Sequence, residues 1–113
     1  MSLGAKIITM SAILNQLSRV LEHRKSADPK DSYAASLYAR GTNAILKKIG
    51  EEAAEVITAA KDGDRAEIVR EVADLWFHTL VLLAHKELEP SMVIEELELR
   101  FGTSGLARKG KSS

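Results

Sequence analysis

The fold of this chain is decided by residues 42–86, TNAILKKIGEEAAEVITAAKDGDRAEIVREVADLWFHTLVLLAHK, which hold two long helical patterns joined at one glycine. Thr42 is a residue typical of helix N-caps, and Gly63 suits the left-handed position that follows a last helical turn. Asp64 begins the second pattern, with Glu67 three residues later in a spacing that resembles a capping box. The sequence therefore predicts two long antiparallel helices that form an αα-hairpin.

Shorter helices are predicted on both sides of this hairpin. An apolar stripe over residues 10–25 predicts an amphipathic first helix, and the polar segment 26–32, which contains a proline, predicts a loop. A short helix is expected over 32–40, ended by Gly41, and a last helix over 90–100 with proline in its first turn. Because no strand-like alternation stands out, we expect an all-α antiparallel bundle of four to five helices.

The composition is typical of one soluble domain. The chain has 113 residues, of which 45% are hydrophobic and 28% are charged, and its 16 basic residues balance its 16 acidic ones. This balance excludes a global basic field that would attract nucleic acid. The absence of cysteine excludes disulfides and thiolate zinc sites, and it fits a reducing cytosol.

No targeting or membrane segment is expected either. The longest apolar stretch, residues 75–84, is about half as long as a membrane span needs. The N-terminus lacks the apolar core and the cleavage signature of a signal peptide. We therefore expect a cytoplasmic protein with a single domain over 1–113, flexible at 1–11 and 109–113, and with neither nucleic acid nor membrane as a partner.

The second helix of the hairpin is apolar around most of its circumference, with Val69, Trp76 and Leu83 among the residues that surround it. A helix of this kind is normally buried. So small a chain has few helices to cover it, and we therefore expect a second subunit to complete the bundle as an intertwined homodimer. The alternative is a monomer with some exposed apolar surface.

Acidic residues are predicted to converge on one side of the hairpin. Glu52 and Glu55 are three residues apart at the margin of the apolar stripe of the first helix, and Glu71 and Asp74 repeat this spacing on the second. Because Glu55 and Glu71 are each eight residues from Gly63, they should lie at the same height on antiparallel helices. Four carboxylates at one place need a cation, because buried charges without partners are costly.

The type of cation follows from the ligands. Oxygen donors without cysteine favour a hard ion, Mg²⁺ or, as a substitute, Mn²⁺. A di-iron bundle would use Glu-x-x-His motifs, whereas here Asp74 stands three residues after Glu71, so this reading is disfavoured. The remaining alternative is that the acids form a solvated surface.

Three segments resemble the phosphoribosyl-ATP pyrophosphatase family. They are SYAASLYARGTNAILKKIGEEAAEV (32–56), EVADLWFHTLVLLA (71–84) and IEELELRFGTSGLARK (94–109), and the resemblance as a whole covers about residues 12–109. The four carboxylates alone are common to the all-α nucleoside triphosphate pyrophosphatases, which include MazG-type enzymes and dimeric dUTPases. In the tail, the sequence departs from the family pattern, because Arg108 stands where the family often has Glu.

The resemblance implies a hydrolase that acts on a phosphoric anhydride. Phosphoribosyl-ATP would be hydrolysed to phosphoribosyl-AMP and pyrophosphate, the second step of histidine biosynthesis, with Mg²⁺ held by four residues: Glu52, Glu55, Glu71 and Asp74. The alternatives are a MazG- or dUTPase-like pyrophosphatase of other nucleoside triphosphates and a non-enzymatic helical dimerisation module.

Further residues are candidates for catalysis and substrate binding. Glu51 could position the attacking water as a general base, the alternative being a solvent-exposed residue without a chemical role. Lys48 lies on the carboxylate side of its helix and is the favoured phosphate contact. The family resemblance adds five candidates for binding the ribose phosphate or the nucleotide: Arg24, Lys25, Ser32, Tyr33 and His78. For Tyr33 core packing is the alternative, and for His78 it is a structural hydrogen bond.

Overall fold

The structure, a computed structural model, describes residues 3–101, with side chains described from residue 12 onward, and every regular element in this part of the chain is a helix. The elements are α1 (Leu3–His23), the 3-10 turn η1 (Arg24–Ser26), α2 (Tyr33–Arg40), α3 (Thr42–Asp62), α4 (Arg65–His85) and α5 (Pro90–Leu99). The all-α prediction is confirmed. The tail motif at 104–106, Arg108 and the segment 109–113 lie outside the described residues.

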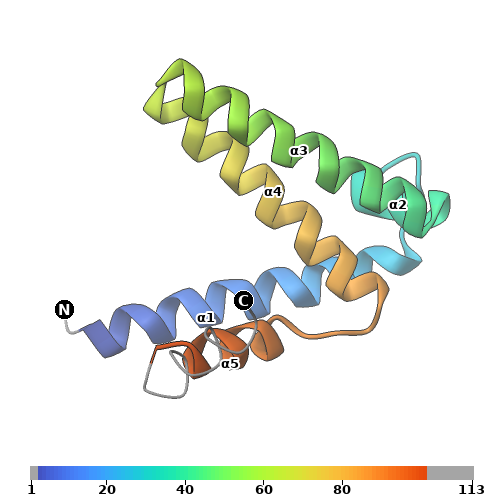
Figure 1. Ribbon diagram of the computed structural model, residues 1–113. Helices are drawn as coiled ribbons and strands as arrows, with labels where there is room; N and C mark the ends of the chain where they lie inside the picture. The colour runs from blue at the N-terminus through green and yellow to red at the C-terminus, as the bar shows by residue number, and fades with distance from the viewer. Residues whose placement is uncertain (1–2, 102–113) are drawn as a thin grey trace.

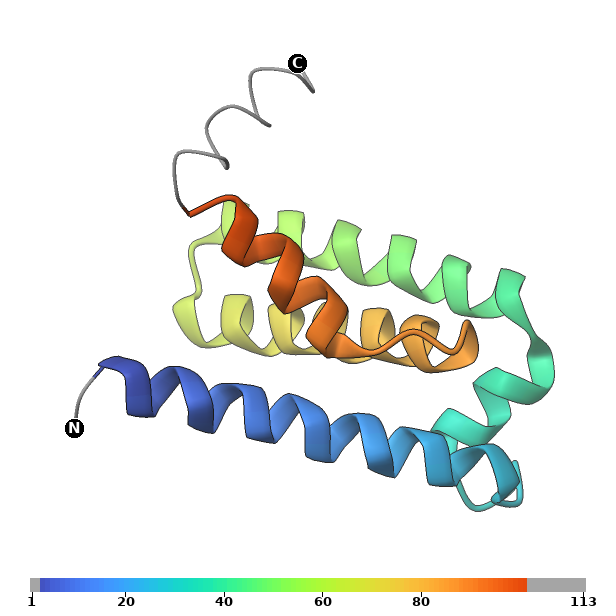
Figure 2. The same ribbon diagram turned by 90° about the horizontal axis from the view of Figure 1, so that it is seen from below.

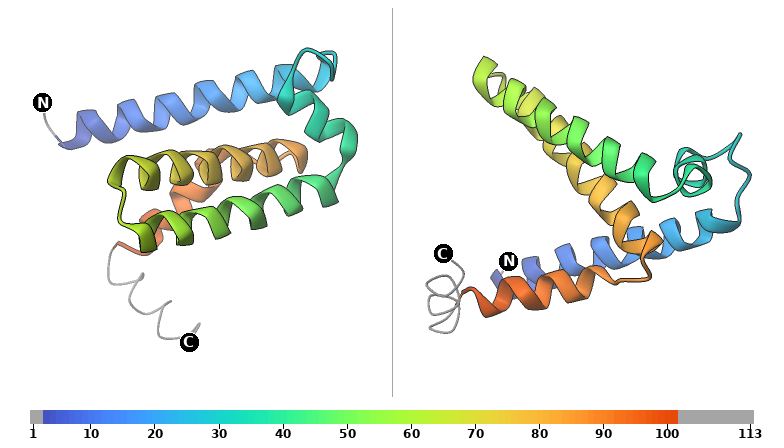
Figure 3. Two further views of the ribbon diagram at one scale, coloured as in Figure 1. Left: turned by 90° about the horizontal axis from the view of Figure 1, so that it is seen from above. Right: turned by 45° about the vertical axis from the view of Figure 1, so that its right-hand side comes forward.

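The helices form two layers (Figure 1). Helices α3 and α4 run side by side as the expected hairpin, and α1 and α5 form a second layer across its base. Figure 2 shows α1 on the side of α4 that faces away from α3, with α5 crossing the view of the hairpin obliquely, and Figure 3 shows that the two layers diverge toward the α3–α4 turn. The hairpin therefore projects from the rest of the chain as an arm.

Local signals at the helix ends explain the hairpin. Gly63 has φ 79° and ψ 9°, the left-handed conformation that glycine adopts without steric cost. Asp64 then caps α4, because its side chain accepts a hydrogen bond of 3.2 Å from the backbone N–H of Glu67. Ser32 caps α2 in the same way, and Pro90 opens α5 in its first turn.

Two expectations about helix starts were wrong. Thr42 is the first residue of α3 rather than its N-cap, a position that Gly41 occupies at φ 93°. The Thr42 hydroxyl is instead 3.1 Å from Nε2 of His85, so a tertiary contact takes the group that would have capped the helix. Helix α1 begins at Leu3 rather than near Met10, since no proline interrupts the chain before it.

The core lies at the base of the hairpin. Leu21 of α1, Leu37 of α2, Ile45 of α3 and Val81 of α4 are the largest fully buried side chains, one from each of four helices. Burial of each such side chain stabilises the fold by about 1.5–3 kcal/mol. The core therefore fixes the base of the arm and leaves the turn at Gly63 outside it.

Helix α4 is not buried on all sides within a single chain. Val69 and Trp76 are 69% and 57% exposed. The radius of gyration is 16.2 Å, whereas about 13 Å is usual for a compact chain of about 100 residues. The apolar surface of α4, which was expected to be buried by a second subunit, is therefore exposed to solvent in the single chain. Among the helices described, none is both long and apolar enough to cross a membrane.

Candidate metal centre

Three of the four predicted carboxylates meet between α3 and α4. Glu52, Glu55 and Glu71 each offer an oxygen atom, and these three atoms lie within 4.8 Å of one another. Two come from α3 and one from α4, so the prediction that Glu55 and Glu71 lie at the same height is confirmed. Such a group of oxygen donors has the geometry to share one cation.

The burial of these oxygens strengthens the case for a cation. Glu52 is only 6% exposed, although it is charged in its ordinary form. Oε2 of Glu52 and Oε2 of Glu71 are buried and have no hydrogen-bond partner among the described residues. An unsatisfied buried polar group costs about 1–3 kcal/mol, and more if it is charged. A hard cation between the two helices would satisfy both oxygens, so the donor set fits such an ion.

The crowding of the carboxylates also raises the pKa of Glu71. Contact with the Glu55 carboxyl, and then with that of Glu67, raises the pKa of Glu71 from 4.5 to about 7. Two ionised carboxylates have no hydrogen to share, so their contact is stable only when one of them is protonated. At this place Glu71 therefore favours a proton or a nearby cation over an uncompensated negative charge.

Lys48 is one basic residue that lies beside the cluster. Its Nζ is 3.4 Å from Glu51 and 3.5 Å from Oε1 of Glu52. Desolvation lowers the pKa of Lys48, but the nearby Tyr33 oxygen and the two carboxylates outweigh it and raise the pKa overall. Because Lys48 reaches Oε1 of Glu52, Oε2 of that residue stays without a partner. One ammonium does not neutralise the group.

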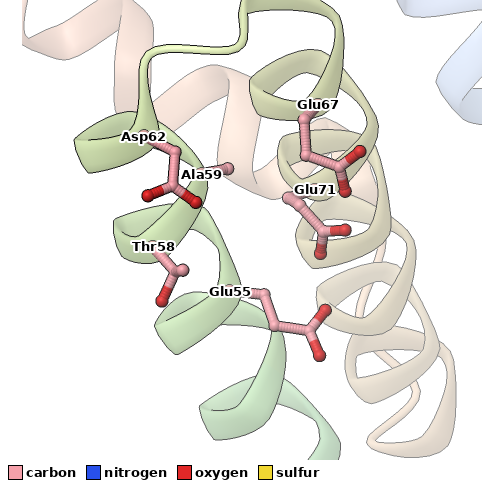
Figure 4. Close-up of a pocket in the computed structure, with 6 residues that line it drawn as sticks. All are labelled: Glu55, Thr58, Ala59, Asp62, Glu67 and Glu71. Atoms are coloured by element: carbon pink, nitrogen blue, oxygen red, sulfur yellow. The ribbon is translucent and has the colours of Figure 1, made fainter.

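A cleft of about 380 Å³ extends from the cluster toward the turn (Figure 4). It is lined by residues of both helices: Glu55, Thr58, Ala59, Asp62, Glu67 and Glu71. In Figure 4 the side chain of Glu55 extends from α3 toward α4, with Glu71 opposite it. Sequence reasoning missed Thr58 and Asp62 as lining residues. Their positions three and seven residues after Glu55 place them on the same side of α3, which is the signal that would have found them.

The fourth predicted ligand lies elsewhere. Asp74 is exposed, and its carboxylate is not part of the group that the three glutamates form. Its backbone oxygen is 2.7 Å from Nδ1 of His78, whose Nε2 is 2.7 Å from the Tyr33 hydroxyl. His78, which was a candidate for substrate binding, is only 5% exposed. A metal-binding role for Asp74 stays a prediction.

The remaining candidates are outside the carboxylate group. Glu51 is exposed and contacts Lys48. At the α1–α2 connection, Lys25 forms an ion pair of 3.0 Å with Glu22, and Arg24 is exposed. The Ser32 oxygen accepts a hydrogen bond from the backbone N–H of Ala35. The structure does not bring Arg24, Lys25 or Ser32 into the cluster.

The sequence of the chain is similar to a family of known proteins. The family model described as phosphoribosyl-ATP pyrophosphohydrolase matches residues 14–101. A curated relative from Ruthia magnifica, named phosphoribosyl-ATP pyrophosphatase, is 59% identical over 102 residues, which are 90% of this chain and 97% of the relative.

Two further relatives carry the same name. The protein from Methylococcus capsulatus is 58% identical over 97 residues, which are 86% of this chain and 92% of the relative. The protein from Methylibium petroleiphilum is 58% identical over 93 residues, which are 82% of this chain and 78% of the relative. The range that the family model matches, residues 14–101, contains both helices of the hairpin.

Proposed function

The chain belongs to the phosphoribosyl-ATP pyrophosphohydrolase family, and on this premise we propose that its cluster of Glu52, Glu55 and Glu71 binds the cation used to hydrolyse phosphoribosyl-ATP. The protein is a hydrolase of a phosphoric anhydride that yields phosphoribosyl-AMP and pyrophosphate, the second step of histidine biosynthesis. The observation that carries the cation proposal is the pair of buried carboxylate oxygens without partners, one on each helix of the hairpin.

The cation that fits best is Mg²⁺, with Mn²⁺ as a substitute. All donors in the cluster are carboxylate oxygens, which hard divalent ions prefer. Asp74 is proposed as a fourth ligand, because its position three residues after Glu71 places it on the same side of α4. When bound, a divalent ion withdraws charge from phosphate oxygens and lowers the pKa of a bound water.

The protein's own residues orient the reacting groups. Water attacks the α-phosphorus in line, the bond to the bridging oxygen breaks, and pyrophosphate leaves. Lys48, which forms an ion pair with Glu52, is the proposed contact for a phosphate oxygen of the substrate. Glu51 contacts Lys48 from solvent and is the proposed base that accepts the proton of the attacking water. The cleft toward the turn gives the polyphosphate a place beside the cluster.

Substrate recognition beyond the phosphates is proposed for residues of the α1–α2 connection. Arg24 and Lys25 supply positive charge in an exposed turn, where the ribose phosphate could bind. Ser32 keeps its hydroxyl hydrogen available, because its oxygen serves as the acceptor in the helix cap. Tyr33 presents a half-exposed ring with its hydroxyl next to His78.

We also propose that the protein works in the cytoplasm as a homodimer. The exposed apolar residues of α4, Val69 and Trp76, lie on the arm, away from the core. A second copy would cover this surface and would give each arm a packed outer face. The open shape of the single chain supports this proposal.

The decisive measurement is the release of pyrophosphate from phosphoribosyl-ATP with and without Mg²⁺. We expect activity only with the cation, and the substitution Glu71→Gln should lower kcat/KM at least about a hundredfold, because it weakens an interaction worth several kcal/mol. Glu98→Gln, at an exposed position of α5, is the control and should leave activity unchanged.

Two outcomes would contradict the proposal. Full activity of the Glu71→Gln protein would show that the carboxylate cluster is not needed for the reaction. A preference for other nucleoside triphosphates over phosphoribosyl-ATP in a side-by-side panel would indicate a pyrophosphatase of the MazG or dUTPase kind instead.

A further inference from the structure

A chain of hydrogen bonds connects α2 to the acidic helix α4. Nδ1 of His78 is 2.7 Å from the backbone oxygen of Asp74, and Nε2 of His78 is 2.7 Å from the Tyr33 hydroxyl. Both distances lie at the short end of the usual range for hydrogen bonds, and the ring is 5% exposed. Tyr33, in contrast, is 48% exposed, so the chain runs from a buried ring to the surface of the protein.

The chemistry of the partners fixes the direction of both bonds. A carbonyl oxygen can only accept, so Nδ1 of His78 carries the hydrogen that is donated to Asp74. In the neutral ring Nε2 then has a lone pair and accepts the hydrogen of the Tyr33 hydroxyl. Among the described residues, this buried side chain has hydrogen bonds and ring contacts but no ion pair with a carboxylate, so a charged ring would be costly here.

The neighbouring rings hold His78 and Tyr33 in this orientation. His78 lies edge-on to Tyr33, with ring centroids 5.6 Å apart, and edge-on to Phe77 at 5.3 Å. Tyr33 and Phe77 are stacked, at 6.3 Å and an interplanar angle of 24°. Three rings in mutual contact restrict the rotation of each, so the hydroxyl of Tyr33 has a fixed place relative to α4.

We propose that His78 is a positioning residue that holds the hydrogen of the Tyr33 hydroxyl and so presents the Tyr33 oxygen to the substrate as a hydrogen-bond acceptor. The partner of that oxygen must then be a donor, such as a sugar hydroxyl or an amino group of the nucleotide. An ionised phosphate oxygen has no hydrogen to donate and is excluded as its partner. This inference rests on the proposed function, and it assigns His78 a role through Tyr33 rather than a contact with substrate.

Lys48 offers the complementary contact. It is an ammonium with only donors, it lies beside Glu52, and it is the proposed phosphate contact. Phosphate would then contact Lys48, and a donor group of the same substrate would contact Tyr33. The two residues would thus divide recognition between the charged and the uncharged parts of the nucleotide.

The tautomer of His78 can be tested without any substrate. Long-range ¹H–¹⁵N correlation spectra of the full chain, with and without Mg²⁺, distinguish hydrogen on Nδ1 from hydrogen on Nε2. We expect His78 to carry its hydrogen on Nδ1 only. A ring that carries hydrogen on Nε2, alone or on both nitrogens, at the pH of the activity assay would overturn the proposal.

A double-mutant cycle tests the consequence for the reaction. Tyr33→Phe should raise KM for phosphoribosyl-ATP by about three- to tenfold, the loss of one neutral hydrogen bond, with kcat little changed. His78→Asn keeps an N–H near the Nδ1 position, but its amide oxygen is one bond too short to reach the Nε2 position that accepts from Tyr33. It should raise KM by no more than Tyr33→Phe does. In the double variant KM should equal that of Tyr33→Phe alone.

The matched control is His85→Asn. His85 is another histidine of α4, with a hydroxyl partner in Thr42 and a stacked ring in Tyr38, but outside the acidic cluster. It should lose stability without any change of KM. If His78→Asn does not fold, His78→Leu, whose side chain has no hydrogen-bond acceptor, takes its place in the cycle.

The outcomes separate this inference from the proposed function. Additive effects of Tyr33→Phe and His78→Asn, in a wild-type protein that does release pyrophosphate, would overturn the inference alone. A wild-type protein without activity on phosphoribosyl-ATP would overturn the proposed function, and the spectra would then decide whether His78 holds the Tyr33 hydrogen.

Discussion

Glu55 of α3 and Glu71 of α4 face each other across the hairpin, each eight residues from Gly63 along the chain. Together with Glu52 they place three carboxylate oxygens within 4.8 Å. Like charges at this range destabilise the folded state unless a proton or a cation separates them. The first two predictions follow from this relationship.

Mg²⁺ should stabilise the protein against heat, and the effect should depend on Glu52. A ligand at about 100 times its Kd adds about 2.7 kcal/mol to the free energy of unfolding, which raises the melting temperature by several degrees. In Glu52→Gln this increase should be lost, while the melting temperature without metal should stay the same or rise because one repelling charge is gone. Thermal melts with Mg²⁺ and with a chelator measure both effects. An equal Mg²⁺ shift in the two proteins would place the cation elsewhere.

Without metal, stability should fall as the pH rises from about 5 to about 8. The pKa of Glu71 is raised to about 7 in the folded protein, from an ordinary value of 4.5. The folded state therefore binds a proton that the unfolded state has released in this range, so the stabilisation is complete below pH 4.5 and is lost as the pH passes 7. Melts in a chelator should show this slope in the wild type and a flatter one in Glu71→Gln. The same slope in both proteins would show that another group is responsible.

Gly63→Ala should destabilise the fold by about 1–2 kcal/mol. The backbone of Gly63 is left-handed, at φ 79°, where a side chain is strained. A methyl group added there would meet no other atom within 4 Å, so the cost is the backbone conformation alone. Gly50→Ala is the matched control, because that glycine is inside α3 with equally open space. It should stabilise by about 0.5–1 kcal/mol. Chemical denaturation should therefore give opposite signs for the two variants.

Trp76 should report on association of the chain with itself. It is the single tryptophan of the sequence, and it is 57% exposed on the outer side of α4. If a second copy covers it, its fluorescence should shift to longer wavelength as the protein is diluted below the dissociation constant of the dimer. Val69→Lys should move this shift to higher protein concentration, because it puts a charge into the same apolar surface. Light scattering that shows a monomer at every concentration would disprove the dimer.

Ile45→Ala should cost about 2–5 kcal/mol of stability, since this side chain is fully buried where four helices meet. Its neighbour Leu46 is 48% exposed, and Leu46→Ala should cost much less. Urea denaturation of the two variants tests whether the core lies at the base of the hairpin. Equal losses would mean that Leu46 is covered as well, most simply by a second subunit.

The sequence predicted those parts of the fold that depend on local chemistry. Gly63, Asp64, Ser32 and Pro90 act on their own helix ends, so the ends that they define were found within a residue or two. The common height of Glu55 and Glu71 was also predictable, because it needs only the turn position and the helical repeat. Family resemblance added the reaction, which geometry alone does not give.

What depends on tertiary packing was not predictable in the same way. Thr42 fails as a cap because its hydroxyl meets His85, which is 43 residues away in the sequence. The bond between Tyr33 and His78 spans 45 residues and depends on how α2 packs on α4. Asp74 has the spacing of a ligand, yet its side chain is exposed, and spacing alone does not determine a rotamer.

The projecting arm gives the cation a mechanical consequence. Glu52 and Glu55 lie between the buried Ile45 and the turn at Gly63, beyond the region where four helices hold one another. Two helices alone resist fraying poorly, so amide hydrogens near the turn should exchange with solvent sooner than those at the base. A divalent ion bound to both α3 and α4 would cross-link the two helices near the turn and slow that exchange. The rigidity of the arm would then depend on the concentration of the metal ion.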